Sequence, residues 1–340
     1  MEIEYSQLCA ALRRAFEVHG VEAAEADTLG RELADATFAG YESHGIGRVR
    51  TYLNALADGT VKAGARLEVV RETAATVLLD AGLGFGVPMA LEAADLVAGK
   101  AGRSGIGAAA IRNCGDVARL APYAERIAER GFLGLVMAND AGSGQVVAPH
   151  GGAQPLLSTN PVAAGIPRPG RRPIVFDMAT SQIALGAVRA AARRREPVPR
   201  GTLVGLGGQP VEDPGALFSG LAALLPLGGP AFGFKGTALS LLVEALAGGL
   251  SGDGFSGDAP DRHGRNAVFM LALDPAAFDG QDAFQARLEG FLDRLRACCP
   301  RSAAAPVRVP GEHGEKPGPG ARIQVLDALW EGLEVLGKEP

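Results

Sequence analysis

An α/β fold is the class that the sequence predicts, and two observations predict it. Short runs rich in β-branched residues follow residue 66 and alternate with Ala-rich stretches at helical spacing, a texture typical of helices built around a sheet. The chain has 340 residues, of which 47% are hydrophobic and 21% charged, so it can bury a large core and is not a disordered protein. The expected strands lie at 67–70, 75–80, 106–111, 133–138 and 174–176.

Before residue 66 the pattern is helical. Helices are expected at 6–19, 23–39 and 46–58, where apolar residues recur every three or four positions and Gly20 and Gly59 mark two of the ends. The remaining elements expected are helices at 88–101, 117–130, 182–195, 235–250, 281–297 and 323–336, strands at 267–273 and 304–309, and a long surface loop at 251–266. We therefore divide the chain into a helical part (1–65), an α/β domain (66–300) and a C-terminal strand and helix (301–340), which we expect to pack on the helical part.

Charge and cysteine content exclude several classes of protein. The net charge is −5 and no run of Lys and Arg is interleaved with aromatic residues, so no nucleic-acid surface is expected. The arginines at 193–195 are interpreted as a solvated helix end. No stretch is long enough to span a membrane, and the N-terminus is acidic where a signal peptide is basic. Four cysteines, at positions 9, 114, 298 and 299, lack metal-site spacing and are expected to be reduced thiols of a cytoplasmic protein.

Three polar side chains follow one another at helical spacing near the start of the third helix. His44, Arg48 and Tyr52 are each one turn apart, so they share one helix face, and a Gly-rich loop (40–47) precedes them. A guanidinium can grip a carboxylate through two hydrogen bonds, while an imidazolium beside it can protonate a neighbouring carbonyl. A lone His of this kind is more often structural, but the pair is what a 2-oxo acid reductase requires.

Glycine-rich turns suggest a nucleotide site but do not define one. The candidates are 82–86, 102–107 and 205–208. None has the spacing GxGxxG at a strand-to-helix turn with an acidic residue about 20 positions later, which a Rossmann fingerprint needs. We interpret all three as ordinary turns.

The segment from Glu42 to Tyr52, ESHGIGRVRTY, resembles the signature of the malate/L-lactate dehydrogenase family, which is distinct from the Rossmann-fold lactate dehydrogenases and includes reductases of cyclic imines. Further segments resemble motifs of this family in the same order: STNP at 158–161, FDMATS at 176–181, the stretch 198–214, FKG at 234–236 with Glu244, and PGE at 310–312. The resemblance thus covers most of the chain.

The resemblance implies that residues 66–300 form a non-Rossmann cofactor domain with a largely antiparallel sheet, that NADPH or NADH is the cofactor, and that the protein is a homodimer with each active site near the interface. It assigns His44 as the proton donor and Ser43 as the residue that assists it. It makes Arg48 the residue that binds the substrate carboxylate, and Tyr52 and Thr159 are expected to contact the substrate as well.

The cofactor contacts that the resemblance implies come from three segments. The first two are Asp177-Met178-Ala179 and Lys235-Gly236, and an ammonium beside a glycine amide at a helix start would suit a pyrophosphate. The third segment is 112–120, which occupies the position of the family's cofactor loop. The contacts expected from this loop are Asp116, Ala118, Arg119 and Leu120.

Several positions depart from the family pattern. Asp116 stands where the family has a His, and Ala118 where it has a Gly. A carboxylate near a phosphate is repulsive, so Asp116 either repels the cofactor or turns toward Arg112 or Arg119 and is neutralised. Two further positions differ as well: Ala187 replaces a Lys, or an Asp in cyclic-imine reducers, and Gly205 replaces a frequent Asp.

The function predicted is hydride transfer between NAD(P)H and C2 of a small 2-oxo or cyclic 2-imino carboxylate. The alternative left open by Asp116 and Ala187 is a divergent member with non-redox chemistry, or an impaired protein that binds small carboxylates.

Overall fold

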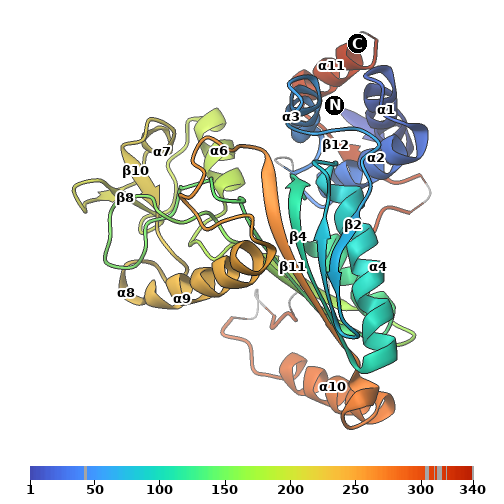
Figure 1. Cartoon of the computed structure of the whole chain (residues 1–340). Helices are drawn as coiled ribbons and strands as arrows, with labels where there is room; N and C mark the ends of the chain where they lie inside the picture. The colour runs from blue at the N-terminus through green and yellow to red at the C-terminus, as the bar shows by residue number, and fades with distance from the viewer. Residues whose placement is uncertain (42–43, 303–305, 310, 312–315, 319, 339–340) are drawn as a thin grey trace.

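The computed structural model describes residues 1–41, 44–302, 306–309, 311, 316–318 and 320–338. Figure 1 shows a central sheet, a helical cap at one end of it that contains both chain termini, and a side lobe. The side lobe is defined here as residues 185–232. No described helix is both long enough and apolar enough to cross a membrane.

The central sheet has seven strands in the order β2-β3-β4-β11-β5-β6-β7. Every pair of neighbours is antiparallel except β3 and β4. The strands are β2 (Glu68–Glu72), β3 (Thr76–Asp80), β4 (Ile106–Gly115), β5 (Leu133–Asn139), β6 (Val162–Ile166), β7 (Ile174–Met178) and β11 (Arg265–Leu273). The α/β class with a largely antiparallel sheet is therefore confirmed.

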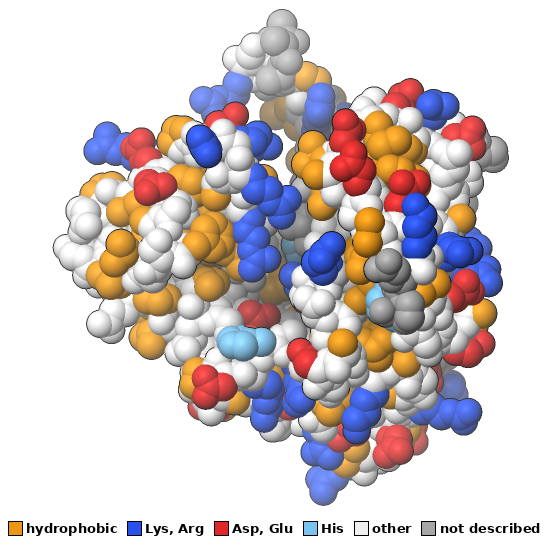
Figure 2. All heavy atoms as spheres, turned by 90° about the horizontal axis from the view of Figure 1, so that it is seen from above, with side chains coloured by type: hydrophobic (Ala, Val, Ile, Leu, Met, Phe, Trp, Pro, Cys, Tyr) orange, Lys and Arg blue, Asp and Glu red, His pale blue; other side chains and the backbone are white. Residues whose placement is uncertain are grey.

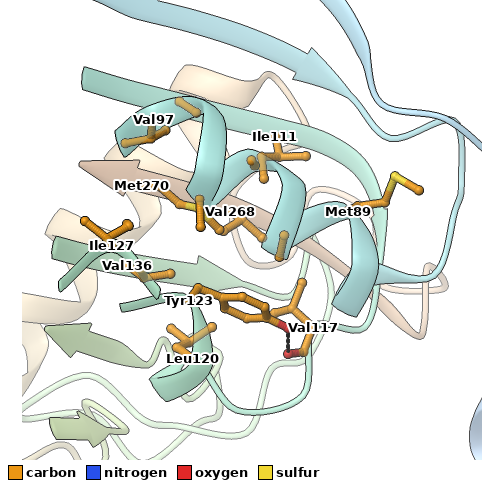
Figure 3. Close-up of a cluster of buried hydrophobic side chains, with 14 of the residues drawn as sticks. Met89, Val97, Ile111, Val117, Leu120, Tyr123, Ile127, Val136, Val268 and Met270 are labelled. Carbon is orange, nitrogen blue, oxygen red and sulfur yellow. Dashed lines mark hydrogen bonds between the residues drawn. The ribbon is translucent and has the colours of Figure 1, made fainter. Parts of the chain in front are cut away.

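Two helices cover one face of this sheet, α4 (Gly86–Ser104) and α5 (Ala121–Glu129). Their apolar residues and those of β4, β5 and β11 form the largest core cluster. Figure 3 shows Tyr123 of α5 inside it, where its hydroxyl donates to the Val117 carbonyl at 2.6 Å. This bond ties the core directly to the loop that precedes α5. On the other face, α9 (Phe234–Val243) and the π-helical segment η3 (Glu244–Gly249) pack against β5.

The helical cap joins the two ends of the chain. Strand β1 pairs with β12 in antiparallel register, with Ile3 opposite Ile323, and α1 packs against α2 and α11. Its elements are β1 (Glu2–Glu4), α1 (Tyr5–Val18), α2 (Ala23–Phe38), the 3-10 turn η2 (Ile46–Arg48), α3 (Val49–Ala57), β12 (Arg322–Gln324) and α11 (Asp327–Leu336). One apolar cluster, including Phe16, Tyr52 and Phe85, connects this cap to the sheet domain.

The side lobe has its own small core around Val188, Leu203 and Leu224. A three-stranded sheet in the order β10-β8-β9 forms its centre. Its elements are α6 (Leu185–Arg194), β8 (Leu203–Gly205), β9 (Pro210–Val211), α7 (Gly215–Phe218), β10 (Ala222–Leu224) and α8 (Gly229–Phe232). The remaining elements, η4 (Pro275–Ala277) and α10 (Gln281–Arg296), lie at the end of the sheet farthest from the cap (Figure 1).

Four predicted elements were wrong in detail. Residues 306–309 form no strand, and the last helix begins at Asp327 because β12 occupies the start of the predicted range. Helix α5 begins at residue 121 instead of 117, because Ala118 has a left-handed backbone with φ of 52°. The stretch 251–266 is not a plain surface loop, since Asp253 is buried and accepts from the Asn113 amide.

Candidate functional site

A groove separates the side lobe from the rest of the molecule. Figure 2, viewed from above, shows this groove and shows Lys and Arg side chains gathered on its left side, where the side lobe lies. Arg189 of α6, in the side lobe, has His44, Arg48 and Asp116 within electrostatic reach. The predicted active-site residues His44 and Arg48 of the cap therefore lie within electrostatic reach of a cation of the side lobe.

His44 lies in the short turn between α2 and η2. Its amide donates to the Tyr41 carbonyl at 2.9 Å. The next residue, Gly45, sits so close to Thr37 of α2 that a Cβ atom would overlap the threonine, and the Thr37 hydroxyl accepts from the Ile46 amide at 2.8 Å. Only glycine fits this approach, so the packing against α2 fixes the position of His44. Ser43 lies outside the described residues and stays a prediction.

Burial is the main influence on the His44 imidazole. Loss of solvent lowers its pKa below the usual value, because the charged form is less well solvated. The carboxylate of Asp116 opposes this, while Arg48, Arg119 and Arg189 act in the same direction as burial. The side chain is thus surrounded by charges that can tune its proton affinity.

Asp116 forms an ion pair with Arg48. We did not predict Arg48 as the ionic partner of this carboxylate from the sequence. The Arg48 Nη2 and Nε atoms both donate to the carboxylate, and Nε lies 3.4 Å from Oδ1. The Tyr52 hydroxyl donates to the same Oδ1 at 2.9 Å, and the Ala118 amide donates to it at 3.0 Å. Burial alone would raise the pKa of Asp116, but the Arg48 guanidinium outweighs it and the pKa is lowered.

Of the two alternatives for Asp116, neutralisation by an arginine is the one that the structure supports, but neither of the two arginines named is the partner. Arg112 instead pairs with Asp80 at 2.9 Å, and Arg119 forms no ion pair among the described residues. The carboxylate is neutralised by Arg48, across 68 residues of sequence. Both Arg48 and Tyr52 reach Asp116 from the same side of α3 and its preceding turn. The two residues therefore share one helix face, as predicted.

Two of the predicted cofactor contacts have structural roles. The Asp177 carboxylate accepts from the amides of Leu120 and Ala121, at 2.7 and 3.0 Å, and so caps the N-terminus of α5. The Gly236 amide donates to the Leu227 carbonyl at 3.0 Å, and a Cβ atom there would overlap Leu227. The expectation that the Gly236 amide is available to a pyrophosphate was wrong.

The neighbouring predicted residues differ in exposure. Met178 is exposed at the end of β7, whereas Ala179 is half-buried. The Thr159 carbonyl accepts from the Thr180 amide at 3.0 Å, which joins the segment 158–161 to the segment that follows β7. Lys235 is exposed, and its ammonium lies 5.3 Å from the centre of the Phe232 ring.

The side chains in this region fit an anionic dinucleotide. The Nε atom of Arg119 is buried and has no hydrogen-bond partner among the described residues, and Arg119 acts electrostatically on both His44 and Asp177. In the described part of the chain, neither Arg189 nor Lys235 forms an ion pair. Cations without an ionic partner suit the phosphate groups of such a ligand, since hydrogen bonds between charged groups are the stronger ones.

Sequence reasoning missed two residues of this site. Asp140 follows directly after β5 and influences Arg48 and Arg189 electrostatically. Arg189 precedes the arginines interpreted as a solvated helix end and was not predicted as a site residue, although it lies within electrostatic reach of Arg48. A polar residue at the end of a strongly apolar strand was the available signal for Asp140.

Comparison with known proteins places this geometry in a family. The family model described as malate/L-lactate dehydrogenase matches residues 3–332. The chain belongs to the malate/L-lactate dehydrogenase family. Like the other dehydrogenases and reductases of this family, it is an oxidoreductase of small carboxylates that uses NADH or NADPH.

Two relatives within the family are bacterial reductases. The chain is 45% identical over 255 residues to the Δ1-pyrroline-2-carboxylate/Δ1-piperideine-2-carboxylate reductase of Pseudomonas syringae pv. tomato, covering 75% of this chain and 72% of that protein. It is 36% identical to the protein of the same name from Pseudomonas putida, covering 98% and 97%. The crystal structure of Δ1-piperideine-2-carboxylate reductase from Pseudomonas syringae has a TM-score of 0.85 at 37% identity, covering 99% of each chain.

Proposed function

We propose that this oxidoreductase transfers hydride between NAD(P)H and C2 of a small 2-oxo or cyclic 2-imino carboxylate. The observation that supports this proposal best is the meeting of His44, Arg48 and Asp116 in a largely desolvated cluster beside the groove. The family name and the names of the two reductases support both kinds of substrate.

Each residue of the cluster has a distinct part in this proposal. His44 donates a proton to the atom attached to C2. Arg48 binds the substrate carboxylate, and since Asp116 occupies its Nε and Nη2 edge, the Nη1 edge is the one that faces the ligand. Tyr52 holds Asp116 in place, and Thr159 contacts the substrate. When bound, the nicotinamide supplies the hydride that C2 accepts.

The alternative, a family member with changed chemistry or a protein that only binds carboxylates, rested on Asp116 and on Ala187. The ion pair with Arg48 neutralises the Asp116 carboxylate and so weakens the first reason, the repulsion of the cofactor, while the replacement at Ala187 stands.

The test is reduction of Δ1-pyrroline-2-carboxylate and of pyruvate with NADH and with NADPH. We expect His44→Gln to lower the rate at least about a hundredfold, the size of a general-acid contribution. The matched control is His263→Gln, which changes an exposed histidine and should leave the rate unchanged. A wild-type protein that reduces neither compound, or an active His44→Gln variant, contradicts the proposal.

We also infer that the protein is a cytoplasmic homodimer. Five large apolar side chains are exposed on α8, on α9 and directly after η3, and clustered exposure of this kind marks interfaces: Phe232, Phe234, Leu241, Leu242 and Leu250. The cytoplasmic location is inferred from the spacing of the four cysteines, which is not that of a disulfide framework. Light scattering should give about twice 34.8 kDa, and Leu241→Glu should shift the mass toward the monomer while Leu206→Glu, also exposed but in the side lobe, does not.

A further inference from the structure

Asp140 is a carboxylate held firmly beside the cluster of His44, Arg48 and Asp116. The Asn266 side-chain amide donates to its Oδ1 at 3.1 Å, and the Ser158 hydroxyl donates to the carboxylate as well. Its backbone carbonyl accepts from the amide and the hydroxyl of Ser143 at 2.9 and 3.0 Å. Gly144 lies so close that a Cβ atom there would overlap the carboxylate. The side chain is thus fixed from several directions.

One residue connects Asp140 with the loop of Asp116. Asn266 lies at the irregular position of β11, where the pairing with β4 shifts register. Its Oδ1 accepts from the Val117 amide at 2.9 Å, while its Nδ2 donates to Asp140. A single amide therefore sets the position of the loop that carries Asp116 and that of Asp140 at the same time.

Asp140 differs from Asp116 in having no ionic partner in the described part of the chain. Burial raises its pKa to about 6, and the charge of Asp116 acts in the same direction, while Arg48 opposes them. At pH 8 the side chain is ionised, and nothing in the described residues neutralises it directly. A desolvated anion without a counterion favours a ligand that carries a positive charge.

We propose that Asp140 is a specificity-determining residue that binds a positively charged nitrogen attached to C2 of the ligand. This inference rests on the proposed function, because it concerns the same substrate site. Arg48 would hold the ligand carboxylate and Asp140 the cationic nitrogen. A 2-oxo or 2-hydroxy acid places a neutral oxygen in that position and gains no ion pair.

The chemistry of reduction agrees with this arrangement. The proton that His44 donates makes the imine nitrogen cationic. When C2 of this protonated imine then accepts hydride, the electron pair of the C=N π bond moves to the nitrogen, which keeps its proton and becomes a neutral amine. The positive charge that Asp140 contacts is present before hydride transfer. Asp140 therefore acts mainly by selecting and orienting the ligand.

Two ligands that differ in one ring atom test the proposal without any turnover. L-Proline carries a charged ring nitrogen beside its carboxylate, and tetrahydrofuran-2-carboxylate of the same configuration carries a neutral oxygen there. Calorimetry at pH 8, with NAD⁺ or NADP⁺ present, measures both dissociation constants. We expect wild type to prefer proline on the order of tenfold to a hundredfold, the range of a charge-assisted contact.

The variant Asp140→Asn should lose this preference and bind the oxygen ligand as wild type does. Asp279→Asn makes the same chemical change on an exposed carboxylate near α10 and should keep the preference. The proposal is overturned if wild type binds the two ligands with equal affinity. It is also overturned if Asp140→Asn lowers the affinity for both ligands by the same factor. Binding of neither ligand also overturns it, and the reduction of pyruvate by the same sample then shows that the proposed function survives.

Discussion

The Asp116 carboxylate forms an ion pair with the Arg48 guanidinium, and the Tyr52 hydroxyl supports the same carboxylate. Both charged side chains are largely removed from solvent, with 21% of Arg48 and 16% of Asp116 exposed. The predicted carboxylate-binding arginine is thus held in one orientation before any substrate arrives.

Loss of the Asp116 charge should destabilise the fold. Asp116→Asn leaves the Arg48 guanidinium largely buried without a counterion, which costs about 3 kcal/mol of unfolding free energy. Asp95→Asn is the matched control, because Asp95 pairs with Arg126 at a more exposed place and its loss should cost no more than about 1 kcal/mol. Urea unfolding measures both. Equal losses in the two variants would show that the Arg48 pair has no special weight.

The pH dependence of reduction should reflect the lowered pKa of His44. Burial lowers this pKa, so the free enzyme holds the protonated donor only at pH values below the usual histidine range. With pyruvate as substrate, kcat/KM for reduction should therefore decline as the pH rises through a midpoint below 6.5. Oxidation of the product should show the opposite trend, because it needs neutral His44.

Neighbouring charges should move that midpoint in known directions. Arg189 lowers the pKa of His44 and Asp116 raises it. Arg189→Gln should move the midpoint up and Asp116→Asn should move it down. A profile unmoved by both changes, in variants that still turn over substrate, would mean that His44 does not supply the proton.

Cofactor affinity should depend on Arg119. Its guanidinium forms no ion pair among the described residues, and a charge-assisted contact of this group with a phosphate is worth about 1.5–3 kcal/mol. Arg119→Gln should weaken NADH or NADPH binding accordingly, and Lys235→Ala should weaken it by no more than that, because Lys235 is exposed. The control is Lys62→Ala, another exposed lysine. Fluorescence titration of the reduced cofactor gives the dissociation constants, and wild-type affinity in Arg119→Gln would exclude this residue as a contact.

The close approach of Gly45 to Thr37 should not tolerate a side chain. Gly45→Ala forces the turn of His44 away from α2 and should cost at least about 1–3 kcal/mol of stability together with most of the activity. Gly99→Ala, in the interior of α4 with no atom nearer than 3.6 Å, should instead be neutral or stabilising by up to about 1 kcal/mol. Thermal unfolding and reduction rates compare the two, and a stable, active Gly45→Ala protein would contradict the assignment.

The sequence by itself determined the local elements and part of the site. Periodicity located α1, α2 and most of the strands of the central sheet to within a few residues, because helices and strands repeat with fixed periods. The same helical period placed Arg48 and Tyr52 on one face, and the structure directs both to Asp116. The order of motifs along the chain indicated the family.

Only the tertiary structure decided which of these groups meet. Strand β11 enters the sheet between β4 and β5, and its Asn266 positions both Asp116 and Asp140, a relationship over sequence distances that no periodic pattern encodes. The sequence alone does not distinguish among three possible ionic partners of the Asp116 carboxylate: Arg48, Arg112 and Arg119. The loop before α5 places Asp116 against the first of them, because the course of the backbone between elements, and not residue type, sets the distance between charges.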